Sequence, residues 1–128
     1  MTVTPWLVAT YMWDITDTWA ANDPMPPENV RKYTRLTQKM AERAKEAGEL
    51  GPLHLGIEYI LGHPEIDAGP LVAQVFPYGD EAARELLAFV RQLIWKEEDP
   101  VPPEGPEGVE WVELTLPEWR KQRTLEKK

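Results

Sequence analysis

The stretch WLVATYMW, from Trp6 to Trp13, is apolar on both faces when it is read as a β-strand, and it decides the predicted fold. A strand without a polar face lies in the middle of a sheet that is covered on both sides, whereas a half-exposed strand alternates apolar and polar residues. The run LVAQVF at Leu71–Phe76 has the same two-sided character. The runs at Leu53–Leu61 and Val109–Leu116 alternate instead. The sequence therefore predicts two central strands and two edge strands.

Helical patterns between these runs give the predicted order of the elements. A helix is expected over about Pro27–Ala47, where apolar residues recur every three or four positions, and a second helix begins near Asp80 with a broad apolar face. The resulting order, β-α-β-β-α-β, is that of ferredoxin-like domains. The predicted fold class is therefore α+β and ferredoxin-like, with a four-stranded antiparallel sheet and two helices on one face.

A third, short helix is expected at the C-terminal end of the chain. Thr115 and Glu118 have the spacing of a capping box, which predicts a basic helix from Pro117 to Glu126. The predicted organisation is a single ferredoxin-like domain over residues 1–117 and a basic C-terminal helix or tail over residues 118–128.

The composition narrows the classes of function. Residues 1–117 carry 9 Lys/Arg and 20 Asp/Glu, whereas residues 118–128 carry 5 and 2, so a basic end follows an acidic body. Direct nucleic-acid binding is not expected, because it requires basic surface that displaces phosphate counterions. The absence of cysteine excludes disulfides, thiolate catalysis and cysteine-ligated metals. Neither a signal peptide nor an apolar run of membrane-spanning length is recognisable, which predicts a cytoplasmic protein without a membrane partner.

One face of the predicted sheet has no helix to cover it. A contiguous apolar surface of this kind marks an interface or a ligand groove. Its cover can be a second copy of the chain, the C-terminal helix folded back through Trp119, or a different protein. The candidate interface residues are the aromatic ones on these elements: Trp6, Tyr11, Trp13, Trp111 and Trp119.

The stretch LGIEYILG…LVAQVFPYGDEAARELLAFVRQL, within Leu55–Leu93, resembles the middle of dimeric α/β-barrel domains. In small members of that superfamily, of the GYD type and the antibiotic-monooxygenase type, a glycine-containing second strand precedes an apolar third strand. An acidic helix start and an Ala/Leu-rich helix then follow. The resemblance implies two ferredoxin-like units that stack their sheets into a barrel around a cavity.

Two small clusters are candidates for chemistry. Glu58 lies four positions after His54 on one predicted strand face, so the two could form an acid–base pair or half of a metal site. The alternative is a solvated histidine beside a solvated glutamate on an edge strand. If the barrel forms, these two residues and Tyr59 lie near the mouth of its cavity and are the candidate catalytic residues.

The second cluster is a candidate metal site in the segment GHPEIDAGP. His63, Glu65 and Asp67 supply one imidazole and two carboxylates within five residues, although a proline turn with local side-chain caps explains the same sequence. The chain has no phosphate-binding glycine loop and no GxSxG or HExxH motif, so neither a cofactor nor an enzymatic activity is predicted.

Two hypotheses of function follow. The first, which the lack of convergent titratable residues favours, is a non-catalytic acidic interaction domain. It would bind another protein through its open sheet face or its C-terminal helix, in the manner of a regulator or a virus-encoded inhibitor. The alternative is a homodimeric α/β-barrel protein that binds or oxidises a hydrophobic small molecule. The partner is therefore expected to be another protein or a second copy of the chain.

Overall fold

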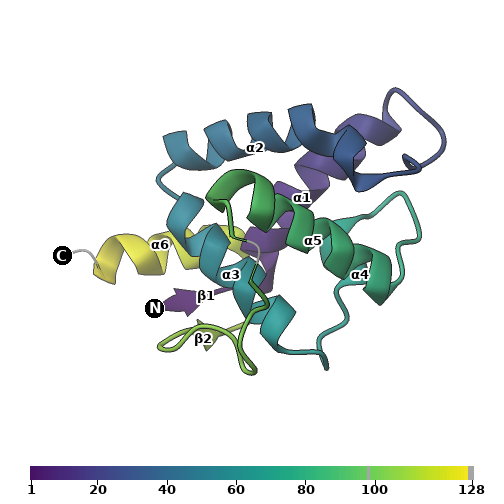
Figure 1. Cartoon of the computed structure of the whole chain (residues 1–128). Helices are drawn as coiled ribbons and strands as arrows, with labels where there is room; N and C mark the ends of the chain where they lie inside the picture. Colours follow the sequence, from purple (N-terminus) through teal and green to yellow (C-terminus); the bar gives the residue numbers. More distant parts are fainter. Residues whose placement is uncertain (98, 127–128) are drawn as a thin grey trace.

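The computed structural model describes residues 1–97 and 99–126 and shows a mostly helical molecule (Figure 1). Two short strands, β1 (Thr2–Val3) and β2 (Glu110–Trp111), pair in parallel with Thr2 opposite Glu110. The helical elements, in chain order, are α1 (Pro5–Ala20), the 3₁₀ turn η1 (Val30–Tyr33), α2 (Thr34–Glu46), α3 (Leu50–Gly62), α4 (Gly69–Val72), α5 (Asp80–Trp95) and α6 (Leu116–Glu126).

The core lies between α1 and the helices that surround it. α1 contacts α2, α3 and α4, and α5 contacts α3 and α4. In Figure 1, α2 crosses above α1 and α5, while α6 and the two strands gather at the end of the molecule where the chain starts. The largest fully buried side chains include Leu7, Met12, Ile15, Tyr33, Met40, Leu53, Ile57, Ile60, Leu86, Leu87 and Trp119.

The ferredoxin-like prediction is wrong, and with it the α+β class. In the described residues the only sheet is the two-stranded pair of β1 and β2, so the four-stranded antiparallel sheet is missing. The sheet implied by the resemblance to dimeric barrels is missing for the same reason. Of the four predicted strands, only the one at Val109–Leu116 contains a β-strand, and that strand is two residues long.

The run Trp6–Trp13 lies inside α1 because a helix start precedes it. Thr4 is the N-cap, and its hydroxyl accepts a hydrogen bond from the Trp6 amide. Pro5 occupies the first turn, where its missing N–H costs no hydrogen bond. A run that is apolar all round is typical of a buried helix as well as of a buried strand. Here it is part of a helix of 16 residues, which is longer than an ordinary strand.

The run Leu53–Leu61 belongs to α3, although its residues alternate. Pro52 lies in the first turn of this helix and does not break it. The buried positions of the run follow helical spacing: Leu53, Gly56, Ile57 and Ile60. Leu71–Phe76 begins in the single turn of α4 and continues without regular structure.

The predicted helices fare better than the predicted strands. The helix expected from Asp80 is α5, and the C-terminal helix expected from Pro117 is α6. The capping box is confirmed: the Thr115 amide donates to Glu118 Oε1 at 3.2 Å, and the Glu118 amide donates to Thr115 Oγ1 at 3.3 Å. The helix expected over Pro27–Ala47 is shorter, because it begins as η1 and becomes α-helical only in α2.

Contacts between distant parts of the chain hold α6 in place. The Thr4 hydroxyl donates to the Leu114 carbonyl at 2.6 Å, and the Leu114 amide donates back to that hydroxyl at 3.1 Å. The Trp119 side chain is 1% exposed, and its indole N–H donates to the Thr2 carbonyl at 2.8 Å. The C-terminal helix is therefore anchored to the core through Trp119, while residues 127–128 of the predicted tail lie outside the described residues.

Candidate functional site

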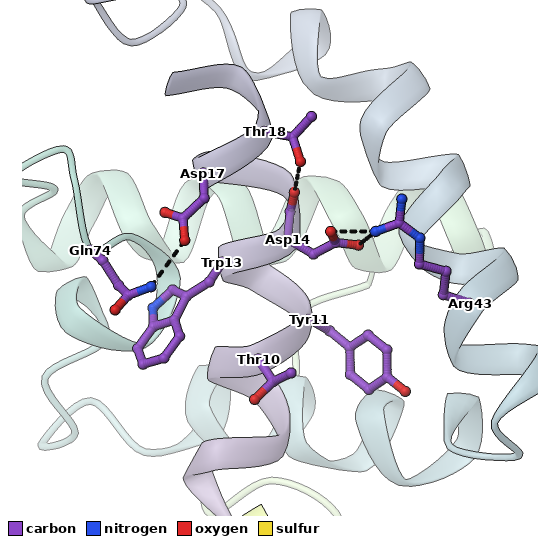
Figure 2. A pocket seen from close by; sticks show the side chains of 8 residues that line it. All are labelled: Thr10, Tyr11, Trp13, Asp14, Asp17, Thr18, Arg43 and Gln74. Atoms are coloured by element: carbon purple, nitrogen blue, oxygen red, sulfur yellow. Dashed lines mark hydrogen bonds and ion pairs between the residues drawn. The ribbon is translucent and has the colours of Figure 1, made fainter. Parts of the chain in front are cut away.

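The outer face of α1 forms one wall of a groove. Helical spacing divides α1 between a buried face, which includes Leu7, Met12 and Ile15, and an outer face of aromatic, hydroxyl and acidic residues. The groove has a volume of about 450 Å³. It is lined by Thr10, Tyr11, Trp13, Asp14, Asp17, Thr18, Arg43 and Gln74 (Figure 2).

The two carboxylates of the groove have different partners. In Figure 2, Arg43 of α2 approaches α1 from one side and forms an ion pair with Asp14. On the other side, the Gln74 amide donates to Asp17 Oδ2 at 2.9 Å. Asp17 Oδ1 is buried and has no hydrogen-bond partner within the described part of the chain. Asp14 is therefore neutralised by a cation, whereas the charge of Asp17 is not.

Two tryptophans of α1 form the aromatic part of this surface. Trp6 is 38% exposed and meets Trp13 edge to face, with ring centroids 6.0 Å apart. The Trp13 indole N–H donates to the Pro70 carbonyl at 3.0 Å, which fixes the orientation of the ring. Trp13 also lines a second hollow, of about 620 Å³, beside the segment 67–79. Val75, next to Gln74 in the chain, is 63% exposed.

Next to the groove, a network around the buried Glu49 joins α1 to α6. Tyr11 donates to Glu49 Oε1 at 2.6 Å, and Arg120 donates to both oxygens of Glu49 at 2.8 and 2.9 Å. Burial and the hydrogen bond to Glu49 raise the pKa of Tyr11 to about 12. Burial alone would raise the pKa of Glu49, but the hydrogen bonds from Arg120 and Tyr11 outweigh it and lower that pKa. This network is structural, because its groups satisfy one another.

The structure separates the five aromatic residues that were predicted to form an interface. Trp6 and Trp13 lie on the outer face of α1, whereas the Tyr11 side chain is only 7% exposed. Trp111 is half-buried and stacks on Tyr59 with centroids 4.7 Å apart. Trp119 is in the core, as described above. Of the five, Trp6 is the one that is exposed, and Trp13 beside it lines the groove.

The predicted pair of His54 and Glu58 does come together, on a helix face instead of a strand face. His54 Nε2 lies 3.6 Å from Glu58 Oε1, because residues four apart on α3 share a face. Tyr59 points elsewhere and stacks between the rings of His63 and Trp111. The three predicted catalytic residues therefore do not converge.

The predicted metal cluster in the segment GHPEIDAGP does not assemble. His63 Nδ1 is 2.7 Å from the Tyr59 carbonyl, and Asp67 accepts a hydrogen bond from the Gly69 amide at 3.3 Å. Glu65 is exposed. Among the described residues, ligand atoms of three potential metal ligands converge at His54, Glu58 and Glu97 instead.

The sequence contained a signal for the groove that the strand interpretation hid. Trp6, Thr10, Trp13 and Asp17 recur at intervals of three or four residues, which is the period of one helix face. Gln74 and Arg43 carry no comparable signal, because tertiary packing alone brings them to α1.

Comparison with protein-family models, with curated proteins and with solved structures found no match for this chain. Of the helices in the described residues, none is long and apolar enough to cross a lipid bilayer. The function must therefore be inferred from the chemistry of the groove itself.

Proposed function

We propose that the protein is a non-catalytic binding domain that takes up a basic segment of another protein in the α1 groove. The observation that carries this proposal is the Asp17 carboxylate, which lines the groove beside Trp13 and has one oxygen without a hydrogen-bond partner. A partly buried charge without a cation costs free energy, and a Lys or Arg side chain from a partner recovers it.

The surroundings of Asp17 allow a cation to reach it. Gln74 is exposed, and its side-chain amide donates to Oδ2 of this carboxylate (Figure 2), beside the unpartnered Oδ1. A guanidinium or ammonium group that displaces this amide replaces a neutral donor with a charged one, which makes a stronger hydrogen bond. The indole of Trp13 provides an aromatic face beside the same carboxylate, and such a face also attracts cations.

The rest of the surface fits a protein segment. Trp6 and Val75 offer exposed apolar area, and tryptophan is enriched among the residues that contribute most to protein–protein binding. The net charge of −8 attracts a basic partner over a longer range and speeds its association. One unpaired carboxylate and two indoles suit binding; acid–base chemistry would need an acid and a base placed together. We also propose a cytoplasmic location, which the cysteine-free sequence fits.

Selection of peptides from a random phage-displayed library tests this proposal. Peptides selected on the full chain should be enriched in Lys or Arg next to an apolar residue. The selected peptide should bind Asp17→Asn at least tenfold more weakly in calorimetric titrations, because the variant removes the unpaired charge. It should bind Gln74→Ala at least as tightly as the unmodified chain, since that variant removes the amide that occupies Asp17 Oδ2.

Asp23→Asn is the matched control. Asp23 also lies near the surface, where it accepts a hydrogen bond from the Met25 amide, but it does not line the groove. This variant should bind the selected peptide with unchanged affinity at physiological salt. An acidic or purely apolar consensus, or equal losses in both Asp variants, would overturn the proposal.

A further inference from the structure

A second cluster of polar side chains lies where α3 packs against α5 and the residues that follow it. His54 and Glu58 are four residues apart on α3, and Glu97 follows the end of α5 by two residues. The potential ligand atoms of these three residues all lie within 4.8 Å of one another. Arg91, which is 7% exposed, projects from α5 into the same place.

Arg91 sets the orientation of both carboxylates. Its guanidinium contacts Glu58 Oε2 at 3.1 Å and Glu97 Oε2 at 2.9 Å. The other oxygen of each carboxylate is turned toward the histidine: Glu97 Oε1 lies 2.9 Å, and Glu58 Oε1 3.6 Å, from His54 Nε2. The arginine thus occupies one oxygen of each glutamate and leaves the other two on the side of the imidazole.

The imidazole is also held in one orientation, and its nitrogen has an unusual environment. The ring stacks on Trp95, with centroids 4.4 Å apart and planes 18° apart. His54 Nε2 is buried and makes no hydrogen bond within the described residues, although Glu97 Oε1 is only 2.9 Å away. Glu97 Oε1 therefore lies off the axis along which Nε2 would form a hydrogen bond.

We propose that His54 Nε2, Glu58 Oε1 and Glu97 Oε1 bind one divalent ion of the Zn²⁺ class. Two ligand atoms that are each about 2.1 Å from Zn²⁺ are about 3.4 Å apart at a tetrahedral angle and about 3.0 Å apart at a right angle. The distances of 2.9 and 3.6 Å from the imidazole nitrogen fall near these values. Ligands that share an ion also lie well off each other's axes, which explains the short contact without a hydrogen bond.

The donor set and the charges select the kind of ion. An imidazole with two carboxylates suits Zn²⁺, whereas Ca²⁺ prefers six or more oxygen ligands. With a neutral His54, two glutamates and one arginine leave a net charge of −1 that a cation compensates. Glu97 and Arg91 also line a hollow of about 840 Å³, through which an ion and its remaining water ligand reach the site. The bound ion would fasten the segment after α5 to α3.

Calorimetric titration of the full chain with ZnCl₂ tests this site. One Zn²⁺ should bind per chain, at least tenfold more tightly than Ca²⁺. His54→Gln and Glu97→Gln should each weaken the binding at least tenfold, and Zn²⁺ should raise the melting temperature of the unmodified chain. His63→Gln is the matched control, because His63 is the other histidine of the chain and lies outside the cluster. This variant should bind Zn²⁺ as the unmodified chain does.

The imidazole resonances provide an independent measurement. On addition of Zn²⁺, the NMR signals of the His54 ring should shift while those of His63 stay in place. No binding, equal binding of Zn²⁺ and Ca²⁺, or binding that is lost in His63→Gln but kept in His54→Gln would overturn the assignment. Because the α1 groove does not include these residues, failure of either proposal leaves the other unaffected.

Discussion

A single buried carboxylate, Glu49, connects three parts of the molecule. It is 3% exposed and receives hydrogen bonds from Tyr11 of α1 and Arg120 of α6, while its own position is the N-cap of α3. A buried charge is tolerated only when it is paired and its oxygens have donors. The carboxylate therefore stabilises the arrangement of these helices only in its ionised form.

Replacing this residue by Glu49→Gln should lower the free energy of unfolding by about 1–3 kcal/mol at neutral pH. The folded-state pKa of Glu49 lies below its unfolded value, so its stabilising contribution is complete above the unfolded pKa. The contribution is lost as the pH falls through the folded-state pKa. Urea unfolding curves measured from neutral to acidic pH should show the difference between the two chains shrinking as the solution becomes acidic.

The exposed Glu46 of α2 provides the control for that measurement. Glu46→Gln should change the unfolding free energy by less than about 0.5 kcal/mol. A difference between the Glu49 variant and the unmodified chain that stays constant down to strongly acidic pH would show that the loss comes from altered packing and not from the charge.

At the scale of elements, two of the three glycines of α3, Gly51 and Gly56, have opposite roles. A Cβ at Gly56 would lie 2.6 Å from Val8 Cγ2 and 3.2 Å from Val3 Cγ1, so this glycine lets α3 approach α1 and β1 closely. A Cβ at Gly51, in the first turn, would meet nothing within 4 Å. Packing requires a glycine at position 56, whereas the glycine at position 51 only makes the helix less favourable.

We therefore expect Gly56→Ala and Gly51→Ala to shift stability in opposite directions. Gly56→Ala should destabilise the fold by about 1–3 kcal/mol, because both valines are fully buried and cannot move aside. Gly51→Ala should stabilise it by about 0.5–1 kcal/mol through helix propensity. Thermal unfolding of the two variants measures both effects. If Gly56→Ala proved as stable as Gly51→Ala, the close approach of α3 to α1 would be wrong.

The elements that the sequence predicts correctly are those with a polar face or a recognisable cap. α5 has a charged outer face, and α6 has the capping box at Thr115 and Glu118. α1 and α3 are mostly apolar, and in short windows a buried helix cannot be distinguished from a buried strand. Two features favour helices here: the helix start at Thr4 and Pro5 in α1, and the helical spacing of the apolar residues in α3. The prediction of a sheet gave both too little weight.

The candidate sites were predictable only in part, for a related reason. His54 and Glu58 are recognisable as a pair because positions four apart share a face on either kind of element. Glu97 and Arg91 join them through the packing of α5 on α3, which no local pattern reveals. In the same way, Gln74 reaches Asp17 across 57 positions of the chain.

At the scale of the whole molecule, the helical fold changes the expected state of association. The alternative of a homodimer depended on an uncovered apolar sheet face, and no such face exists in the described residues. The large exposed apolar side chains instead belong to separate segments: Met1, Trp6, Met25, Val75 and Val112.

We therefore expect a monomer of 14.7 kDa in light scattering after size exclusion, over a wide range of concentrations. A stable dimer would contradict this expectation. If Trp6→Ala then dissociated that dimer, the outer face of α1 beside the groove would be a contact between copies of the chain, and the proposed basic partner would have to be abandoned.

The pairing of β1 with β2 has a consequence for the synthesis of the protein. The first residues of the chain acquire their partners only when residues 110–119 have left the ribosome, because β2, Leu114 and Trp119 supply them. Until then Val3, which is fully buried in the finished fold, has no neighbouring strand. Contacts between such distant positions form late and slowly. A chain whose translation stops before residue 110 therefore leaves Val3 exposed, which makes it more open to aggregation and degradation.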